Sequence, residues 1–280
     1  MTTEKIVIFE ISSKDVSFRL EGTTIPKDEE SSYQNVLLDI LPFGEAPEKT
    51  FIHQVRGDKH YFVYVEVNGH EGKGILLTVD KLPPHLEFLT DCRKLLQNFP
   101  DIPFTININE DQRPDPPNIH IRNIDAALFS ILAGESVFVI DTPENVFEII
   151  KLFYLILPES IREKFTFLSM SNSEQQKQNW KITGLENISE FQEDAVIIQN
   201  KIAYGPYQSD TCKQVARLLE KNQLEEAVNI LQDLQTLVES KRELDLTKIN
   251  VREFQIQHEL AFNDAQLVIK MIQYLYKGGI

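Results

Sequence analysis

The chain divides at a proline-rich segment near its middle. Residues Phe99–Pro117 contain five of the thirteen prolines, together with the acidic pair Glu110 and Asp111. Proline removes a backbone donor and fixes φ, so such a segment resists both helix and sheet. At 280 residues the chain is also long for one ordinary domain and comfortable for two. We therefore predict one domain over residues 1–100, a proline-rich linker over 101–117 and a second domain over 118–280.

The first hundred residues predict an antiparallel sheet with helices. Short runs rich in β-branched and aromatic residues alternate with turn sequences such as Gly57-Asp58 and Asn68-Gly69, and Asn-Gly is a strong hairpin signal. A helix is expected over Pro84–Gln97 from the spacing of its leucines, and the brief segment Tyr33–Ile40 could be another. The predicted order is therefore β-β-(α)-β-β-β-α. The predicted strands are Ile6–Ile11, Val16–Leu20, Thr50–Val55, Tyr61–Val67 and Lys73–Val79.

The second half has a different pattern, in which helices alternate with short apolar strands. An apolar helix over Ile121–Leu132 is expected to stop at Gly134. The run Val137–Ile140 is wholly apolar, as in a strand covered on both faces, and Asp141–Glu144 is a helix-start cluster. We predict a three-layer α/β domain with a parallel sheet and a helical C-terminal region. The remaining predicted elements are a helix over Glu144–Leu157, strands at Phe165–Leu168, Lys181–Thr183 and Ala195–Ile198, and helices at Thr211–Lys221, Leu224–Ser240 and Asp264–Tyr276.

Charge and composition exclude several classes of partner. The formal net charge is −15 and the densest basic runs are short, so the chain would repel phosphate backbones and we predict no nucleic acid partner. No stretch of about 18 apolar residues occurs, so we predict no membrane span. The two cysteines, Cys92 and Cys212, are far apart, and the N-terminus has the pattern of a strand. These features predict a cytoplasmic protein with free thiols.

The sequence contains no recognisable catalytic, cofactor or metal motif. The glycine-rich run Gly69–Gly74 lacks the spacing and the hydroxyl residue of a phosphate-binding loop, and a hairpin turn explains it better. The six histidines are scattered, and neither cysteine has a second cysteine nearby, as a zinc site would require. We therefore expect no cofactor and no metal, and a small-molecule enzyme is not the favoured interpretation.

Arg56 is the candidate for regulatory chemistry. An arginine on an exposed loop can be inserted into the site of a GTPase, where it stabilises charge on the transferring phosphate. Arg56 lies in the turn between two predicted strands, and Arg113 in the proline-rich segment is the second candidate. A solvated turn arginine without such a role is the alternative for both residues.

The central segment resembles a known family. Ala127–Ile140, followed by a helix that ends at Leu157-Pro158 and the strand Phe165–Leu168, resembles the core of DENN domains. The preceding β-β-α-β-β-β-α order is similar to a longin or roadblock-like module. In the folliculin and nitrogen-permease-regulator-like branch of DENN proteins, such a longin module precedes the DENN part. The stretch Leu132–Phe167 is also similar to bacterial GTPase-associated proteins of conflict systems.

The resemblance implies a longin-like half, a DENN-like half and a small Ras-like GTPase as partner. In this hypothesis the chain activates a GTPase or exchanges its nucleotide, with Arg56 as an arginine finger. The alternative is an adaptor or scaffold that pairs with a second longin or roadblock protein. An exposed Arg56 near a groove favours the first, and exposed apolar positions on the Pro84–Gln97 helix favour the second. An α/β enzyme would instead require a deep pocket with convergent polar groups.

Overall fold

The computed structural model describes residues 5–12, 17–23, 26–41, 49–68, 71–98, 117, 119–171, 180–185, 195–206 and 208–277. The predicted linker therefore lies outside the described residues, apart from Pro117. Within the described parts the chain has a mixed α/β fold, as the sequence predicts.

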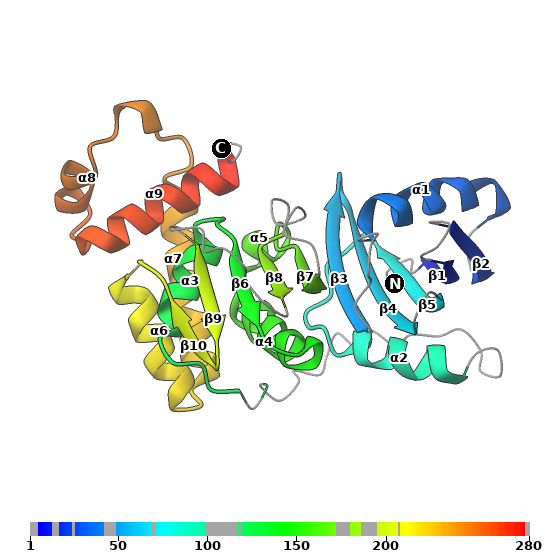
Figure 1. Cartoon of the computed structure of the whole chain (residues 1–280). Coiled ribbons are helices and arrows are strands. Elements are labelled where there is room, and N and C mark those ends of the chain that lie inside the picture. Colours follow the sequence, from blue (N-terminus) through cyan, green and yellow to red (C-terminus); the bar gives the residue numbers. More distant parts are fainter. Residues whose placement is uncertain are drawn as a thin grey trace.

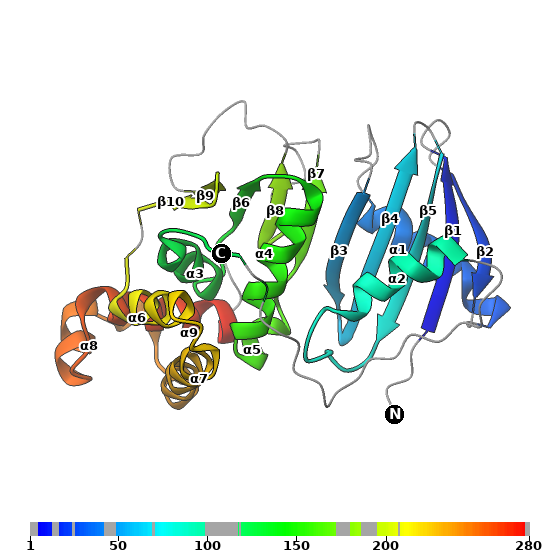
Figure 2. The same ribbon diagram turned by 90° about the horizontal axis from the view of Figure 1, so that it is seen from below.

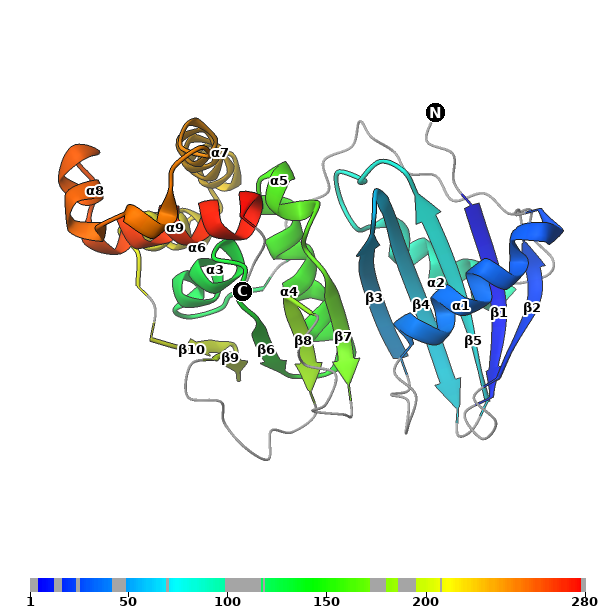
Figure 3. The ribbon, with the colours of Figure 1, turned by 90° about the horizontal axis from the view of Figure 1, so that it is seen from above.

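The first half confirms the predicted order of strands and helices. Its α-helices lie on opposite faces of the antiparallel strands, as Figures 2 and 3 show. The second helix begins at Phe88, four residues later than predicted, after Pro83 and Pro84. The elements are β1 (Lys5–Ser12), β2 (Ser17–Thr23), a 3-10 turn (Lys27–Glu29), α1 (Glu30–Ile40), β3 (Lys49–Arg56), β4 (Lys59–Asn68), β5 (Glu71–Val79) and α2 (Phe88–Asn98).

The second half alternates helices and short strands before a helical C-terminal region. Gly134, with φ of +78°, follows the first of these helices, and Thr142 caps the next helix, whose first residue is Pro143. The sequence did not predict β10 or α8. The elements are α3 (Ile124–Leu132), β6 (Val137–Ile140), α4 (Pro143–Ile156), α5 (Glu159–Arg162), β7 (Phe167–Ser171), β8 (Ile182–Leu185), β9 (Val196–Gln199), β10 (Ile202–Tyr204), α6 (Asp210–Glu220), α7 (Leu224–Ser240), a 3-10 turn (Leu246–Lys248), α8 (Val251–Gln257) and α9 (Phe262–Tyr276).

The strands of both halves form one sheet, in the order β10-β9-β6-β8-β7-β3-β4-β5-β1-β2 (Figure 1). Strands β9, β6, β8 and β7 are parallel, as predicted for the second half. The halves meet where β3 pairs antiparallel with β7, at Ile52 with Leu168 and His53 with Phe167. The division into two domains stays a prediction, and one sheet extends across it.

One hydrophobic core also extends across this junction. Phe62 and Tyr64 of β4 belong to the same buried cluster as the inward faces of α3 and α4. At the junction, the rings of Phe51 and Phe147 stack with their centroids 3.9 Å apart, and Tyr154 donates a hydrogen bond to the carbonyl of Pro83 at 2.8 Å. The two halves are therefore joined by side-chain packing as well as by strand pairing.

The layers of the second half lie on one side of the sheet in the described residues. Helices α3 and α4 pack directly on the strands, and α6, α7 and α9 pack on those two helices (Figure 2). The opposite face carries a separate buried cluster that includes Phe138, Leu185 and Ile197. In the described residues, the second half thus stacks strands, inner helices and outer helices on one side of the sheet.

Candidate functional site

Arg56 lies at the end of β3, next to the turn that leads into β4. Only Gly57 and Asp58 separate the two strands, and Arg56 faces Lys59 in the register. Gly57 has φ of +63°, which is the left-handed conformation that such two-residue hairpins require at their first turn position. The glycine therefore fixes a tight turn, and the turn fixes the position of the arginine.

The guanidinium of Arg56 is anchored over the α1 face of the sheet. Its Nη1 donates to Oδ2 of Asp39 on α1 at 2.8 Å, and its Nη2 donates to Oε1 of Gln54 at 3.4 Å. About a third of the Arg56 side chain is exposed (31%), as is most of Asp39 (64%). The arginine is therefore accessible from solvent, but it is held by an ion pair that the sequence did not predict.

An exposed apolar residue is the neighbour of Asp39 in the sequence. Leu38, which precedes Asp39 in the last turn of α1, is 41% exposed although it is a large hydrophobic residue. The hydroxyl of Tyr61 lies on the same face, and burial raises its pKa while the charge of Arg56 lowers it. The Arg56 site, meaning Arg56, Asp39 and Leu38, thus combines a cation, an anion and an exposed apolar group.

The structure gives less support to the other candidates that the sequence suggested. Arg113 lies outside the described residues. The described apolar side chains of α2, including Leu89, Cys92 and Leu96, are buried, so they provide no apolar contact surface. Arg56 does not line the cavity of about 350 Å³ found in the second half.

Two buried histidines, which looked scattered in the sequence, meet at the junction of the halves. Nδ1 of His53 lies 2.6 Å from the carbonyl oxygen of Phe165 and must carry a hydrogen, because a carbonyl only accepts. Nε2 of neutral His53 then accepts from Nδ1 of His60, at 3.3 Å. The β3–β4 register, in which Val55 faces His60, brings the two rings together. The register of this hairpin, which places the two histidines seven residues apart on one face, is the signal from which the pair could have been found.

Burial keeps this histidine pair neutral. The ring of His53 is fully buried and stacks on Phe62, with centroids 4.2 Å apart. Burial, together with the charge that His60 can carry, lowers the pKa of His53 to about 3. Burial also lowers the pKa of His60. Phe165 lies two residues before the start of β7. The hydrogen bond from His53 to its carbonyl therefore links β3 to the second half.

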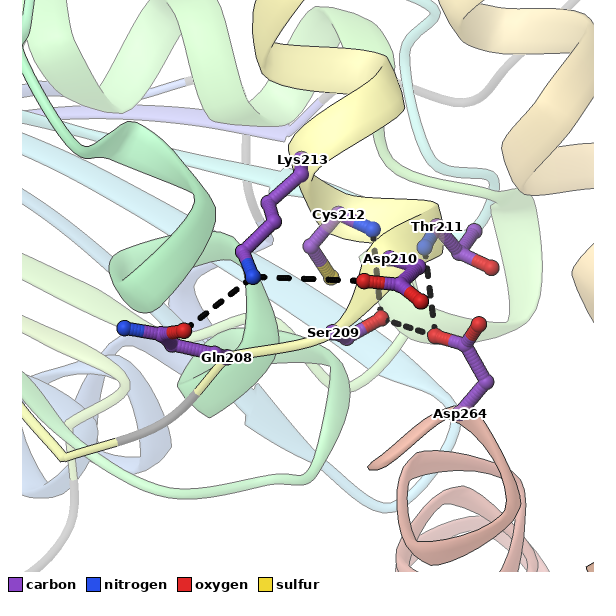
Figure 4. A network of polar contacts seen from close by, with 7 residues as sticks. All are labelled: Gln208, Ser209, Asp210, Thr211, Cys212, Lys213 and Asp264. Carbon is purple, nitrogen blue, oxygen red and sulfur yellow. Dashed lines mark hydrogen bonds and ion pairs between the residues drawn. The ribbon is translucent and has the colours of Figure 1, made fainter. Parts of the chain in front are cut away.

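A serine, a cysteine and an aspartate meet at the start of α6, but their geometry is that of a helix cap (Figure 4). Ser209 donates to Asp264 and accepts from the backbone N–H of Cys212 at 3.2 Å. Asp264, in the first turn of α9, also accepts from the backbone N–H of Thr211 at 3.1 Å. Burial raises the pKa of Cys212 to about 12, so its thiol stays protonated. The network therefore docks α9 onto α6.

The described residues form neither a metal site nor a membrane span. Across the described ranges, no three His, Cys, Asp or Glu side chains come together in a way that could hold a metal ion. None of the described helices combines the length and the apolar character needed to cross a membrane. No known protein family matches the chain, and no curated protein sequence matches it significantly.

Proposed function

We propose that this protein regulates a small Ras-like GTPase through direct protein contacts, with Arg56 acting on the transferring phosphate. The observation that carries the proposal is the position of Arg56: a tight glycine turn presents it at the tip of a hairpin, partly exposed. The resemblance of the first half to a longin module and of the second to a DENN core supports the choice of a GTPase as partner.

The ion pair with Asp39 would hold Arg56 at rest. Exposed ion pairs are typically worth about 0–1 kcal/mol, whereas an inserted arginine accelerates GTP hydrolysis about 10³- to 10⁵-fold. Opening the Arg56–Asp39 pair at 2.8 Å therefore costs little compared with what the arginine contributes in the complex. Leu38, which precedes Asp39 in α1, would supply an apolar contact to the same partner.

Single-turnover GTP hydrolysis tests the proposal. A panel of purified Ras-like GTPases is loaded with GTP and mixed with the chain, and both phosphate release and nucleotide release are followed. Stimulated hydrolysis should fall at least about 10³-fold in Arg56→Ala. Lys59→Ala, which removes the facing cation of the same hairpin, is the matched control and should retain the stimulation. Unchanged stimulation in Arg56→Ala would reject the role of Arg56.

The alternative is an adaptor that pairs with a longin or roadblock protein. One observation favours it: β2 is the last strand of the sheet, and no described strand covers its outer side. An edge strand offers unpaired donors and acceptors to which another strand can add. Tight binding to a roadblock-type protein, together with unchanged hydrolysis and release for every GTPase in the panel, would favour the adaptor over the regulator.

A further inference from the structure

A cavity of about 350 Å³ lies in the second half of the molecule, away from the residues of the Arg56 site. It opens between the segment that precedes α3 and the helices α4, α6 and α7, which cluster in Figure 2. Its volume is within the range of small-molecule sites, and a cavity lined by apolar groups holds an apolar ligand better than it holds water. The principal apolar lining residues are Ile121, Ile124, Leu152, Ala216, Leu219 and Leu224.

Backbone hydrogen bonds fix two walls of this cavity. On one wall, Arg122 donates its N–H to the carbonyl of Lys201 and accepts from the N–H of Ala203, both at 2.9 Å, which ties the segment to β10. On the other wall, Asn222 has φ of +58° and turns the chain from α6 into α7, and Gln223 donates to the carbonyl of Leu218 at 2.9 Å. The cavity is thus bounded by secondary structure on both sides.

Polar and charged side chains stand at the mouth of the cavity. His120 and Arg122 belong to the segment before α3, and Glu220 belongs to the last turn of α6. All three are exposed, and none makes an ion pair with another described residue. A guanidinium is a good receptor for a carboxylate, because it can donate two parallel hydrogen bonds to it.

We propose that this cavity binds an amphipathic carboxylate of medium chain length. Its hydrocarbon chain would lie among the apolar lining residues, and its carboxylate would reach Arg122 and His120 at the mouth. Glu220, on the opposite wall, opposes the negative charge and so limits the affinity. The site does not depend on Arg56, so it can fail or succeed independently of GTPase regulation.

Titration calorimetry of the full chain with decanoate and with decan-1-ol tests the site. Decanoate should bind with a stoichiometry of one, about five- to tenfold more tightly than decan-1-ol. Arg122→Gln should remove that advantage and leave decan-1-ol binding unchanged, whereas Glu220→Gln should strengthen decanoate binding. Arg217→Gln removes an exposed cation of α6 that does not line the cavity, and it should change neither affinity.

Ala216→Phe places a ring in the cavity and should abolish binding of both ligands, with far-UV circular dichroism confirming the fold. Retained binding in this variant, equal affinities for the two ligands, or no binding of either would overturn the proposal.

A second experiment uses vesicles of phosphatidylglycerol to distinguish binding of a free carboxylate from binding to a lipid surface. Sedimentation of the chain with these vesicles, without binding of free decanoate, would assign the cationic mouth to a membrane surface and also overturn it.

Discussion

The two halves of this molecule build one sheet by opposite means. The first half uses antiparallel strands of seven to ten residues, and it presents a charged hairpin tip between β3 and β4. The second half uses mostly parallel strands of three to five residues, of which β6 leads to β7 through α4 and α5, and it encloses a cavity. The comparison shows that the Arg56–Asp39 ion pair lies at a strand end, whereas the cavity forms where helices pack on helices.

The junction between the halves determines whether the two halves unfold together or separately. Only two residue pairs join β3 to β7, but they lie within a continuous core. If the core couples the halves, they unfold together. If it does not, each half unfolds as a separate unit, because small single domains unfold cooperatively.

The largest expected effect comes from Phe167→Ala at this junction. The Phe167 side chain is fully buried, and truncation of a buried phenylalanine costs about 3–5 kcal/mol in the free energy of unfolding. Chemical denaturation, followed by far-UV circular dichroism and by fluorescence of Trp180, should show a single transition shifted to lower denaturant. Two separated transitions, of which only one moves, would instead show that the halves are energetically independent.

The second effect is a dependence of stability on pH through His53. The unfolded chain takes up this proton near pH 6.5, whereas the folded chain resists it until about pH 3. Stability is therefore complete above pH 6.5 and is lost as the pH falls through that window, by up to about 1.4 kcal/mol per pH unit.

His53→Asn keeps a donor for the Phe165 carbonyl but cannot titrate, so it should flatten this dependence. His120→Asn, at an exposed position, is the matched control and should leave the dependence intact. Denaturation midpoints measured between pH 4 and 8 provide the comparison. An equally steep dependence in His53→Asn would show that other groups are responsible for it.

The smallest of these effects concerns the cap that docks α9 onto α6. Asp264→Asn removes the charge that accepts hydrogen bonds from Ser209 and Thr211, and loss of such a cap costs about 1–2 kcal/mol. Asp210→Asn, at an exposed position in the first turn of α6, should cost less. Equal midpoints of thermal unfolding for the two variants would show that the network in Figure 4 contributes little.

Local signals predicted most of the elements. The turn at Gly57, the stop at Gly134 and the cap at Thr142 are encoded within a few residues, so the sequence placed them well. The start of β7 was placed two residues too early, because the backbone N–H of Phe165 still bonds to Arg162 at the end of α5 and its carbonyl is taken by His53.

Contacts between distant segments were not predicted, because they depend on the order of strands and on the packing of helices. Two of these features, the Arg56–Asp39 ion pair and the cavity near Arg122, join elements that are separated in the sequence. The His53–His60 pair depends on the register of a hairpin. Such pairings follow from topology, which local periodicity does not determine. For the same reason the sequence identified Arg56 as a candidate but not the residue that holds it.

The most direct test of a catalytic Arg56 compares its effect on two states of one GTPase. An arginine that stabilises the transferring phosphate binds the transition state more tightly than the ground state. The affinity of the chain is therefore measured for the GTPase bound to a non-hydrolysable GTP analogue and for the GTPase bound to GDP with aluminium fluoride. Arg56→Ala should weaken only the second complex, by at least about 100-fold, and Lys59→Ala should weaken neither. Equal losses in both complexes, or no loss in the second, would contradict the account.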